Sequence, residues 1–286
     1  MPIPFVKLEG AGNGYIVIDA RDLERNWSSL APRLCDPHFG VGSNGLALVE
    51  RSDLAPVRMR IINSDGSESE MSGNGIRLFA KFVLDAGIAE AGQDGLPIET
   101  AGGIRVVYPR FGSSGMQSAR VAMGRPVFRP HDIPVDVAAL GGADRLVDHP
   151  LTVAGRTLRV TCLAIGNPHA VALLDEPVED FPLADVGPAV TEHPLFPNRI
   201  NFEIVHVESR SRIRVRIFER GEGETLASGT GSTASVIAAR LHDRVEDDVE
   251  VVLPGGALRV RWDGEGEAEL EGPAVEVFRG VWPDSD

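Results

Sequence analysis

One pattern occurs twice in the chain and constrains the fold more than any other feature. Around residue 72 the sequence reads RMRIINSDGSESEMSGNGIRLFAKFV, and around residue 228 it reads RVRIFERGEGETLASGTGSTASVIAA. Each copy contains an alternating strand, an acidic turn, the motif Ser-Gly-x-Gly and an apolar helix. Ser72 follows Asn63 by nine residues, and Ser228 follows Glu219 by nine. The repeat predicts two halves built on one plan that face each other across a pseudo-twofold axis.

The remaining periodicity fits a chain rich in short strands. Runs that are β-branched or alternate in polarity and end at Gly, Pro, Asn or Asp predict strands. They lie at 15–19, 45–50, 57–62, 104–108, 158–165, 213–218, 249–253 and 258–262. Apolar residues at one-face spacing predict a helix over 76–87, and a small, apolar run predicts a second over 232–242.

Charge and cysteine content exclude several classes of protein. The 28 basic and 42 acidic residues give a net charge of −14, which repels phosphate backbones, so we expect no nucleic-acid partner. Absence of a long apolar run and of a secretory leader predicts no membrane segment and a cytoplasmic protein. Cys35 and Cys162 are too few for a disulfide scaffold and are expected to be buried, inert thiols. No histidine pair has metal-ligand spacing, so no metal site is predicted.

Each Ser-Gly-x-Gly motif precedes a helix and therefore supplies an anion site. The first N–H groups of a helix have no intrahelical acceptor, and the helix dipole adds partial positive charge there. A carboxylate or an enolate-like oxyanion fits such a place. A serine before a helix is also an ordinary N-cap worth about 1 kcal/mol. Because the motif is duplicated, Ser72 and Ser228 can instead serve the two faces of one bound carbon.

Motifs spread along nearly the whole chain support one family. They are GAGNGYIVID near the start, INSDGSESEMSGNG (62–75), IGNPHAV (165–171), FPNRINFEIV (196–205), FERGEGETLASGTG (218–231) and GPAVEVFRGVW (272–282). With these motifs the chain resembles the diaminopimelate epimerases, cofactor-independent enzymes of lysine and peptidoglycan precursor synthesis. The resemblance implies epimerisation of LL-diaminopimelate to meso-diaminopimelate by two bases, without pyridoxal phosphate or another cofactor. A small amino-acid substrate is thus the expected partner, and a homodimer stays an open expectation.

The resemblance also implies the architecture. It predicts an α+β fold of two similar domains, each a mixed β-sheet around a central helix, with the active site in the cleft between them. The first domain is expected at 1–120 together with 273–286, because the final strand around 275–282 returns to it. The second domain is expected at 121–272.

The family's functional residues transfer by position in these motifs. The two acid/base positions match Ser72 and Ser228, and His169 with Glu219 is expected to tune the proton-transfer pair. Substrate-binding residues are expected to be four asparagines, a charged pair and two loops that bind the reacting carboxylate. They are Asn13, Asn63, Asn167 and Asn201, then Glu219 and Arg220, and finally Gly73, Asn74, Gly229 and Thr230.

The chain departs from the family pattern at its most important positions. The acid/base residues of the family are cysteines, and both are serines here. A thiol ionises near neutral pH at a helix N-terminus, whereas a hydroxyl needs a partnered base, and the sequence shows none beside either serine. Gly14, Asn44 and Gly45 also stand where the family has other side chains.

Three explanations of the serines stay open at this point. In the first explanation, the cysteines expected at positions 72 and 228 have been changed to serine deliberately, and Cys35 and Cys162 have been left unchanged. Alternatively, the chain is a natural paralogue that uses serines to isomerise another amino acid. In the third explanation it is a binding protein that has kept the pocket and lost the chemistry.

Overall fold

The chain divides into two compact units. The computed structural model describes residues 2–69, 72–113, 115–137 and 144–283. Unit 1 comprises Met1–Ala122 and Glu271–Asp286, and unit 2 comprises Met123–Leu270. The division falls within two strands, β8 (Gly115–Gly124) and β17 (Ala268–Pro273).

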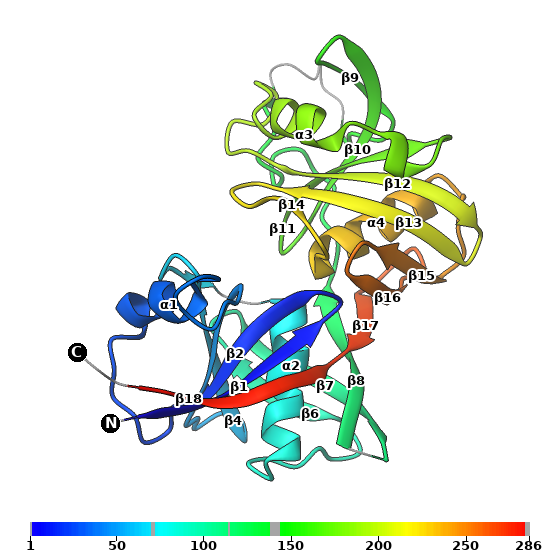
Figure 1. The fold of residues 1–286 in the computed structure, drawn as a ribbon. Coiled ribbons are helices and arrows are strands. Elements are labelled where there is room, and N and C mark those ends of the chain that lie inside the picture. The colour runs from blue at the N-terminus through cyan, green and yellow to red at the C-terminus, as the bar shows by residue number, and fades with distance from the viewer. Residues whose placement is uncertain (1, 70–71, 114, 138–143, 284–286) are drawn as a thin grey trace. The chain divides into compact units, whose positions relative to one another are not determined.

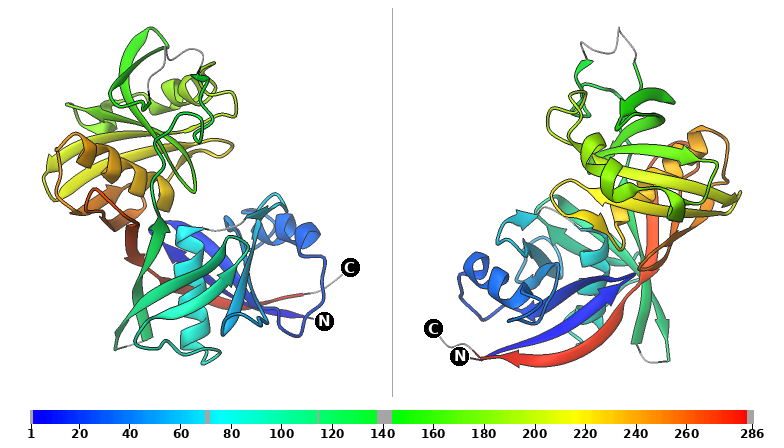
Figure 2. Two further views of the ribbon diagram at one scale, coloured as in Figure 1. Left: turned by 180° about the vertical axis from the view of Figure 1, so that it is seen from behind. Right: turned by 45° about the horizontal axis from the view of Figure 1, so that its top comes forward.

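Unit 1 contains a mixed sheet in the order β18-β1-β2-β3-β4-β6-β7-β8. Besides β8, the strands of unit 1 are β1 (Ile3–Gly10), β2 (Asn13–Asp19), β3 (Gly45–Glu50), β4 (Val57–Asn63), β5 (Glu68–Ser69), β6 (Leu96–Thr100), β7 (Gly103–Gly112) and β18 (Val275–Trp282). The pairs β2–β3 and β4–β6 are parallel, and the other neighbours in this order are antiparallel. The chain's last strand therefore pairs with its first, as the red and dark blue strands in Figure 2 show.

The helix α2 (Gly73–Asp85) is the central element of unit 1. It packs against β1, β2, β3, β4 and β7, and it is buried nearly all round, from Gly73 to Lys81 (Figure 1). A shorter helix, α1 (Trp27–Cys35), packs on β3 and β4 and contributes Trp27, Leu30 and Leu34 to an apolar cluster of unit 1. Because both faces of β2 are covered, its residues 15–18 are all buried and apolar or aromatic.

Unit 2 repeats this connectivity. Its strands are β9 (His149–Val153), β10 (Arg156–Ile165), β11 (Asn167–Leu174), β12 (Asn201–Ser209), β13 (Arg212–Glu219), β14 (Gly223–Thr225), β15 (Asp248–Leu253) and β16 (Gly256–Arg261). The sheet order is β9-β10-β11-β12-β13-β15-β16, again with two parallel pairs, β11–β12 and β13–β15. The helix α4 (Gly229–Leu241) is the central one, and α3 (Leu183–Thr191) and the short 3₁₀ helix η2 (Val178–Asp180) pack on the strands.

Every strand expected from periodicity forms, within a mixed α/β fold. Both predicted helices form too, but each begins three residues earlier than expected, at Gly73 and Gly229. The glycines of the motif lower helix propensity, which is why periodicity placed the start later. Serine capping overrides that penalty, and the Gly-x-Gly segment becomes the first helical turn. The helices α1 and α3 were not predicted, since each is short and contains a proline.

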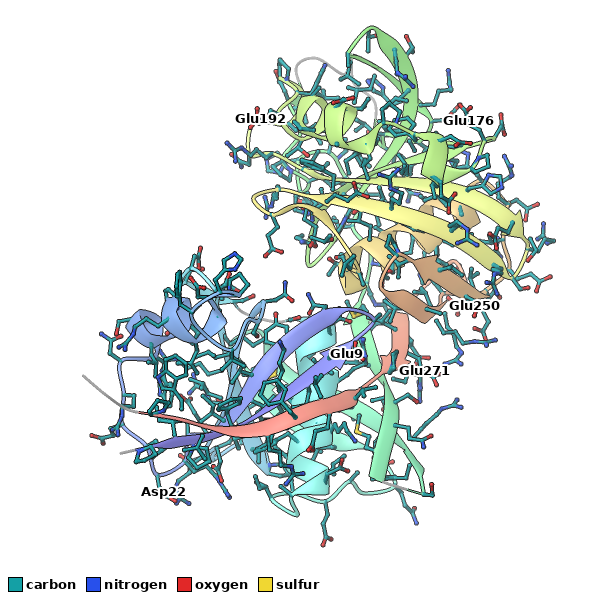
Figure 3. All side chains as sticks on the ribbon, viewed as in Figure 1. Glu9, Asp22, Glu176, Glu192, Glu250 and Glu271 are labelled. Atoms are coloured by element: carbon teal, nitrogen blue, oxygen red, sulfur yellow. The ribbon has the colours of Figure 1, made fainter. Side chains whose placement is uncertain are left out.

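Acidic side chains cover the surface of both units, in agreement with the net charge of −14. Asp22 of unit 1 and Glu176 and Glu192 of unit 2 are exposed and point away from the ribbon (Figure 3). Within the described residues, no helix is both long enough and apolar enough to cross a membrane.

Burial around α2 generates a stability prediction. Phe79 is 0% exposed on this helix, whereas Phe39 is 90% exposed in a loop of the same unit. Phe79→Ala is expected to lower the free energy of unfolding by about 3–5 kcal/mol, because it removes buried apolar surface and leaves a cavity. Phe39→Ala is the matched control and should change it by less than about 0.5 kcal/mol. Urea unfolding measures both, and equal losses would show that α2 is not the centre of the core.

Candidate active site

The predicted site residues of unit 1 gather at one end of its sheet and at the start of α2. Asn13 begins β2, and Asn63 ends β4. The register joins them through β3, because Tyr15 lies opposite Gly45 and Gly45 lies opposite Asn63. The chain then turns through β5 into the loop that carries Ser72, Gly73 and Asn74.

Ser72 is the N-cap of α2. Its hydroxyl accepts a hydrogen bond from the Gly75 N–H at 3.0 Å, and its backbone is extended, with φ −135° and ψ 125°. A Cβ on Gly75 would lie 3.1 Å from Ser72 Cβ, so glycine leaves room for the serine side chain. The N–H groups of Gly73 and Asn74 begin the helix and have no intrahelical acceptor. This end of α2 can therefore bind an anion beside the Ser72 hydroxyl.

The residues that depart from the family pattern take part in the structure of the loop around Asn13. Asn44 Oδ1 accepts from the Gly14 N–H at 3.0 Å, and the Asn44 N–H donates to Gly14 O at 3.0 Å. A Cβ at Gly45 would lie 2.6 Å from Ile62 O, so only glycine fits there. Asn63 donates to Ser67 Oγ at 3.0 Å. Asn13 Oδ1 is buried without a hydrogen-bond partner in the described part of the chain, which leaves it available to a ligand.

Arg77 is a buried residue at this site that the sequence reasoning missed. It is 0% exposed and donates hydrogen bonds to Gly73 O, at 2.7 Å, and to Asn74 Oδ1. Burial lowers the pKa of its guanidinium to about 10. The available signal was a charged residue between Ile76 and Leu78 in an otherwise apolar run.

The predicted residues of unit 2 occupy the corresponding places in its own sheet. Asn167 begins β11, Asn201 begins β12, and Glu219 ends β13. Asn201 Oδ1 accepts from the Arg220 N–H at 2.9 Å, while its Nδ2 is buried and has no partner among the described residues. The Arg220 side chain is exposed and donates to Asn198 O at 3.2 Å.

Ser228 caps α4 as Ser72 caps α2. Its φ of −137° and ψ of 129° match those of Ser72 closely, and its hydroxyl accepts from the Gly231 N–H at 3.3 Å. Thr230 Oγ1 lies 3.4 Å from Ser228 Oγ. The Ser228 hydroxyl also lies near the carboxyl group of Glu219 and lowers its pKa. Glu219 is therefore a candidate base for Ser228.

His169 links a buried carboxyl group to a half-buried asparagine behind this loop. Its Nδ1 is 2.7 Å from Glu203 Oε1, and its Nε2 is 2.7 Å from Asn167 Oδ1. Both His169 and Glu203 are 0% exposed, and burial raises the pKa of Glu203. A Cβ on Gly231 would lie 2.9 Å from Glu203 Oε1, so this glycine admits the carboxyl group beneath the first turn of α4. Sequence reasoning missed Glu203, although a glutamate inside the apolar run NFEIV was a usable signal.

The cysteines take no part in either set of residues. Cys35 and Cys162 are buried and free, as predicted. Burial raises the pKa of the Cys35 thiol to about 11 and raises the pKa of the Cys162 thiol as well. No group of three or more His, Cys, Asp or Glu side chains among the described residues is arranged to hold a metal ion.

The environment of Glu219 generates a pH prediction. Burial, opposed by the nearby Ser228 hydroxyl, raises the pKa of Glu219 above its ordinary value of 4.5. The folded protein therefore binds this proton more tightly than the unfolded chain, and that stabilisation is lost as the pH rises from 4.5 through the folded pKa. Relative to Glu219→Gln, the native protein should lose stability across this range. Urea unfolding at several pH values tests this, with exposed Glu265→Gln as control; a native protein that gains stability relative to Glu219→Gln as the pH rises would contradict it.

Comparison with known proteins identifies the family. The diaminopimelate epimerase family model matches residues 5–128 and 161–277. The chain is 42% identical over 284 residues to a diaminopimelate epimerase from Moorella thermoacetica, covering 98% of this chain and 99% of that protein. It is 41% identical over 282 residues to one from Desulfovibrio desulfuricans, with 97% of each covered.

Solved structures share the fold at much lower identity. A hydroxyproline epimerase from Agrobacterium vitis has a TM-score of 0.73 at 13% identity, covering all of this chain (100%) and 93% of that one. A phenazine biosynthesis protein of the PhzF family from Bacillus anthracis has a TM-score of 0.70 at 17% identity, with 98% and 99% covered. These likenesses concern the fold alone. The full-length match to curated relatives is what shows that the chain belongs to the diaminopimelate epimerase family.

Proposed function

We propose that the protein epimerises LL-diaminopimelate to meso-diaminopimelate without a cofactor, in the cytoplasm. Family membership at about 40% identity over nearly the whole chain supports the reaction and the substrate. One structural observation supports the two-base form of the mechanism. Two helices of the same length begin at serines with nearly the same backbone angles, and each hydroxyl is held by the N–H of the third helical residue.

In this proposal the two units are the epimerase-like domains, 1–120 with 273–286 and 121–272. They are related by a pseudo-twofold axis and close on the substrate, with the Ser72 and Ser228 positions at opposite faces of its α-carbon. The asparagines at 13, 63, 167 and 201 bind its polar groups, because an amide both donates and accepts. Glu219 and Arg220 bind the distal amino-acid end, and the helix N-termini at Gly73–Asn74 and Gly229–Thr230 bind the reacting carboxylate.

The two serines have different surroundings, so the two proton-transfer positions are unequal. A hydroxyl ionises far above neutral pH and therefore removes an α-proton only with help from a base. The Ser228 hydroxyl lies near Glu219, and both Ser228 and His169 lower the pKa of its carboxyl. For Ser72, the described residues provide the Gly75 N–H and no carboxyl or imidazole partner. Abstraction at Ser228 is thus better supported than abstraction at Ser72.

Restoring the cysteines tests this proposal. We expect the serine protein to epimerise diaminopimelate at least about 10³-fold more slowly than the Ser72→Cys, Ser228→Cys double variant. Either single cysteine should promote α-hydrogen exchange more than inversion, because inversion needs an acid opposite the base. Deuterium incorporation at the α-carbon, together with chiral separation of the products, measures both reactions.

Two outcomes of this assay would refute parts of the proposal. A double-cysteine protein that binds diaminopimelate without exchange or inversion would favour the binding-protein explanation. Turnover by the serine protein at a normal enzymatic rate would show that each hydroxyl has an activating base, as expected for a natural serine paralogue.

Arg220 generates a separate binding prediction. Its guanidinium is exposed in unit 2 and is free to form a bidentate pair with a ligand carboxylate. Arg220→Ala is expected to weaken diaminopimelate binding by about 2–4 kcal/mol in calorimetry, because the carboxylate loses its partner. Arg199→Ala, also at an exposed arginine of unit 2, is the control and should leave the affinity unchanged. Equal affinities for the Arg220 variant and the native protein would remove Arg220 from the site.

Assembly into a homodimer stays a prediction.

A further inference from the structure

A fully buried cation, Arg77, lies directly behind the Ser72 loop, and none of the described carboxylates forms an ion pair with it. We propose that Arg77 is a positioning residue whose fixed charge makes the start of α2 a binding site for the reacting carboxylate of the substrate. The ligand carboxylate is then the counter-charge that the described residues do not provide. This inference rests on the proposed function and deepens it, because it assigns a source to the anion affinity of one loop.

The contacts of Arg77 orient the loop. One terminal nitrogen of its guanidinium donates to Gly73 O at 2.7 Å, and the other donates to Asn74 Oδ1. Both acceptors belong to the residues whose backbone N–H groups begin the helix. The guanidinium thereby turns the carbonyl and the side-chain oxygen of these residues towards itself. Their N–H groups keep the positive end of the helix for a ligand.

The charge of Arg77 is uncompensated within the described part of the chain. Its side chain is 0% exposed, and among the described residues its Nε has no hydrogen-bond partner and no carboxylate forms an ion pair with it. Lys81, one turn further along the same helix, shows the usual arrangement, because it donates to Asp85 Oδ2 at 2.7 Å. A buried charge without a partner is costly. Arg77 also lies near the positive end of the α2 dipole, which is unfavourable for a second positive charge. A bound anion offsets both the buried charge and the dipole.

The internal repeat separates the hydrogen bond of Arg77 from its charge. Thr233 occupies the equivalent place in α4, five positions after Ser228, as Arg77 is five after Ser72. Thr233 Oγ1 donates to Gly229 O at 2.8 Å, as Arg77 donates to Gly73 O. A neutral threonine therefore suffices for the bond to the first helical carbonyl. The guanidinium of Arg77 brings in addition a positive charge, which the structural bond does not require.

Three variants on α2 separate charge from packing. Arg77→Gln keeps hydrogen-bond donors and removes the charge, and Arg77→Lys keeps the charge. Lys81→Gln is the matched control, since it removes a buried cation from the same helix outside the proposed site. Calorimetry with diaminopimelate gives the affinity, and backbone amide shifts of Gly73 and Asn74 report on titration with acetate, a bare carboxylate. Both titrations are run at low and high NaCl, because the effect of a charge depends on screening.

The expected result is a loss specific to the charge. Arg77→Gln should weaken binding of diaminopimelate and acetate by about 10- to 100-fold and flatten the salt dependence. Arg77→Lys should recover most of this loss, and Lys81→Gln should bind as the native protein does. Unchanged affinity and salt dependence in a folded Arg77→Gln protein would overturn the inference.

Two further outcomes keep the inference distinct from the proposed function. If acetate shifts the Gly73 and Asn74 amides of the native protein but diaminopimelate does not bind, the proposed function fails and the carboxylate site stands. If Arg77→Gln does not fold, the native protein decides, because an absence of salt-dependent acetate shifts at these two amides would refute the site.

Discussion

The hydrogen bond from a helix N–H to a serine hydroxyl is the interaction on which both halves of this molecule depend. In unit 1 it joins Gly75 to Ser72, and in unit 2 it joins Gly231 to Ser228. Each bond fixes the point at which a strand-and-turn segment becomes a nearly fully buried helix. Because the helix begins there, its free N–H groups and its dipole are brought to the same place as the reactive side chain. Fold and candidate chemistry therefore share one local cause.

Divergence of the repeat has given the two loops opposite electrostatic surroundings. Asn63 ends β4 where Glu219 ends β13, and Arg77 stands where α4 has Thr233. Glu203 has its counterpart in Ala47, since Phe202 and Leu46 pair with equivalent positions of the next strand. The loop of unit 1 is thus backed by a cation, whereas the loop of unit 2 is backed by two carboxyl groups and His169. The two loops therefore share a scaffold and an exposed helix N-terminus, but differ in the titratable groups that lie behind them.

The sequence was sufficient for elements whose pattern is local. The apolar run 45–50 and the alternating run 57–62 became strands because such segments fit a buried pleated sheet. The duplicated Ser-Gly-x-Gly motif located both central helices, and motif order located most of the polar residues near them. The sequence could not show the buried groups whose role depends on contacts that form only in the folded chain. Arg77 and Glu203 each lie in an apolar run, and their importance depends on what folding brings to them: the first-turn carbonyl of α2 for one, His169 and Gly231 for the other.

A hydroxyl at the two caps, where the family resemblance implies a thiol, suits the helix better than it suits the proposed chemistry. A serine is the better N-cap, because its oxygen accepts a strong hydrogen bond from the helix N–H, whereas sulfur is a weak acceptor. The same hydrogen bond that stabilises the helix favours the anionic form of the capping atom. The intrinsic pKa of a hydroxyl is so high, however, that this bond alone does not ionise a serine near neutral pH. A neighbouring base must take up the proton. In the proposed mechanism Glu219 is that base in unit 2, where burial raises the pKa of its carboxyl and makes it a stronger base than an ordinary glutamate. The capping geometry is therefore compatible with either residue, and the proton chemistry is decided by the groups that surround it.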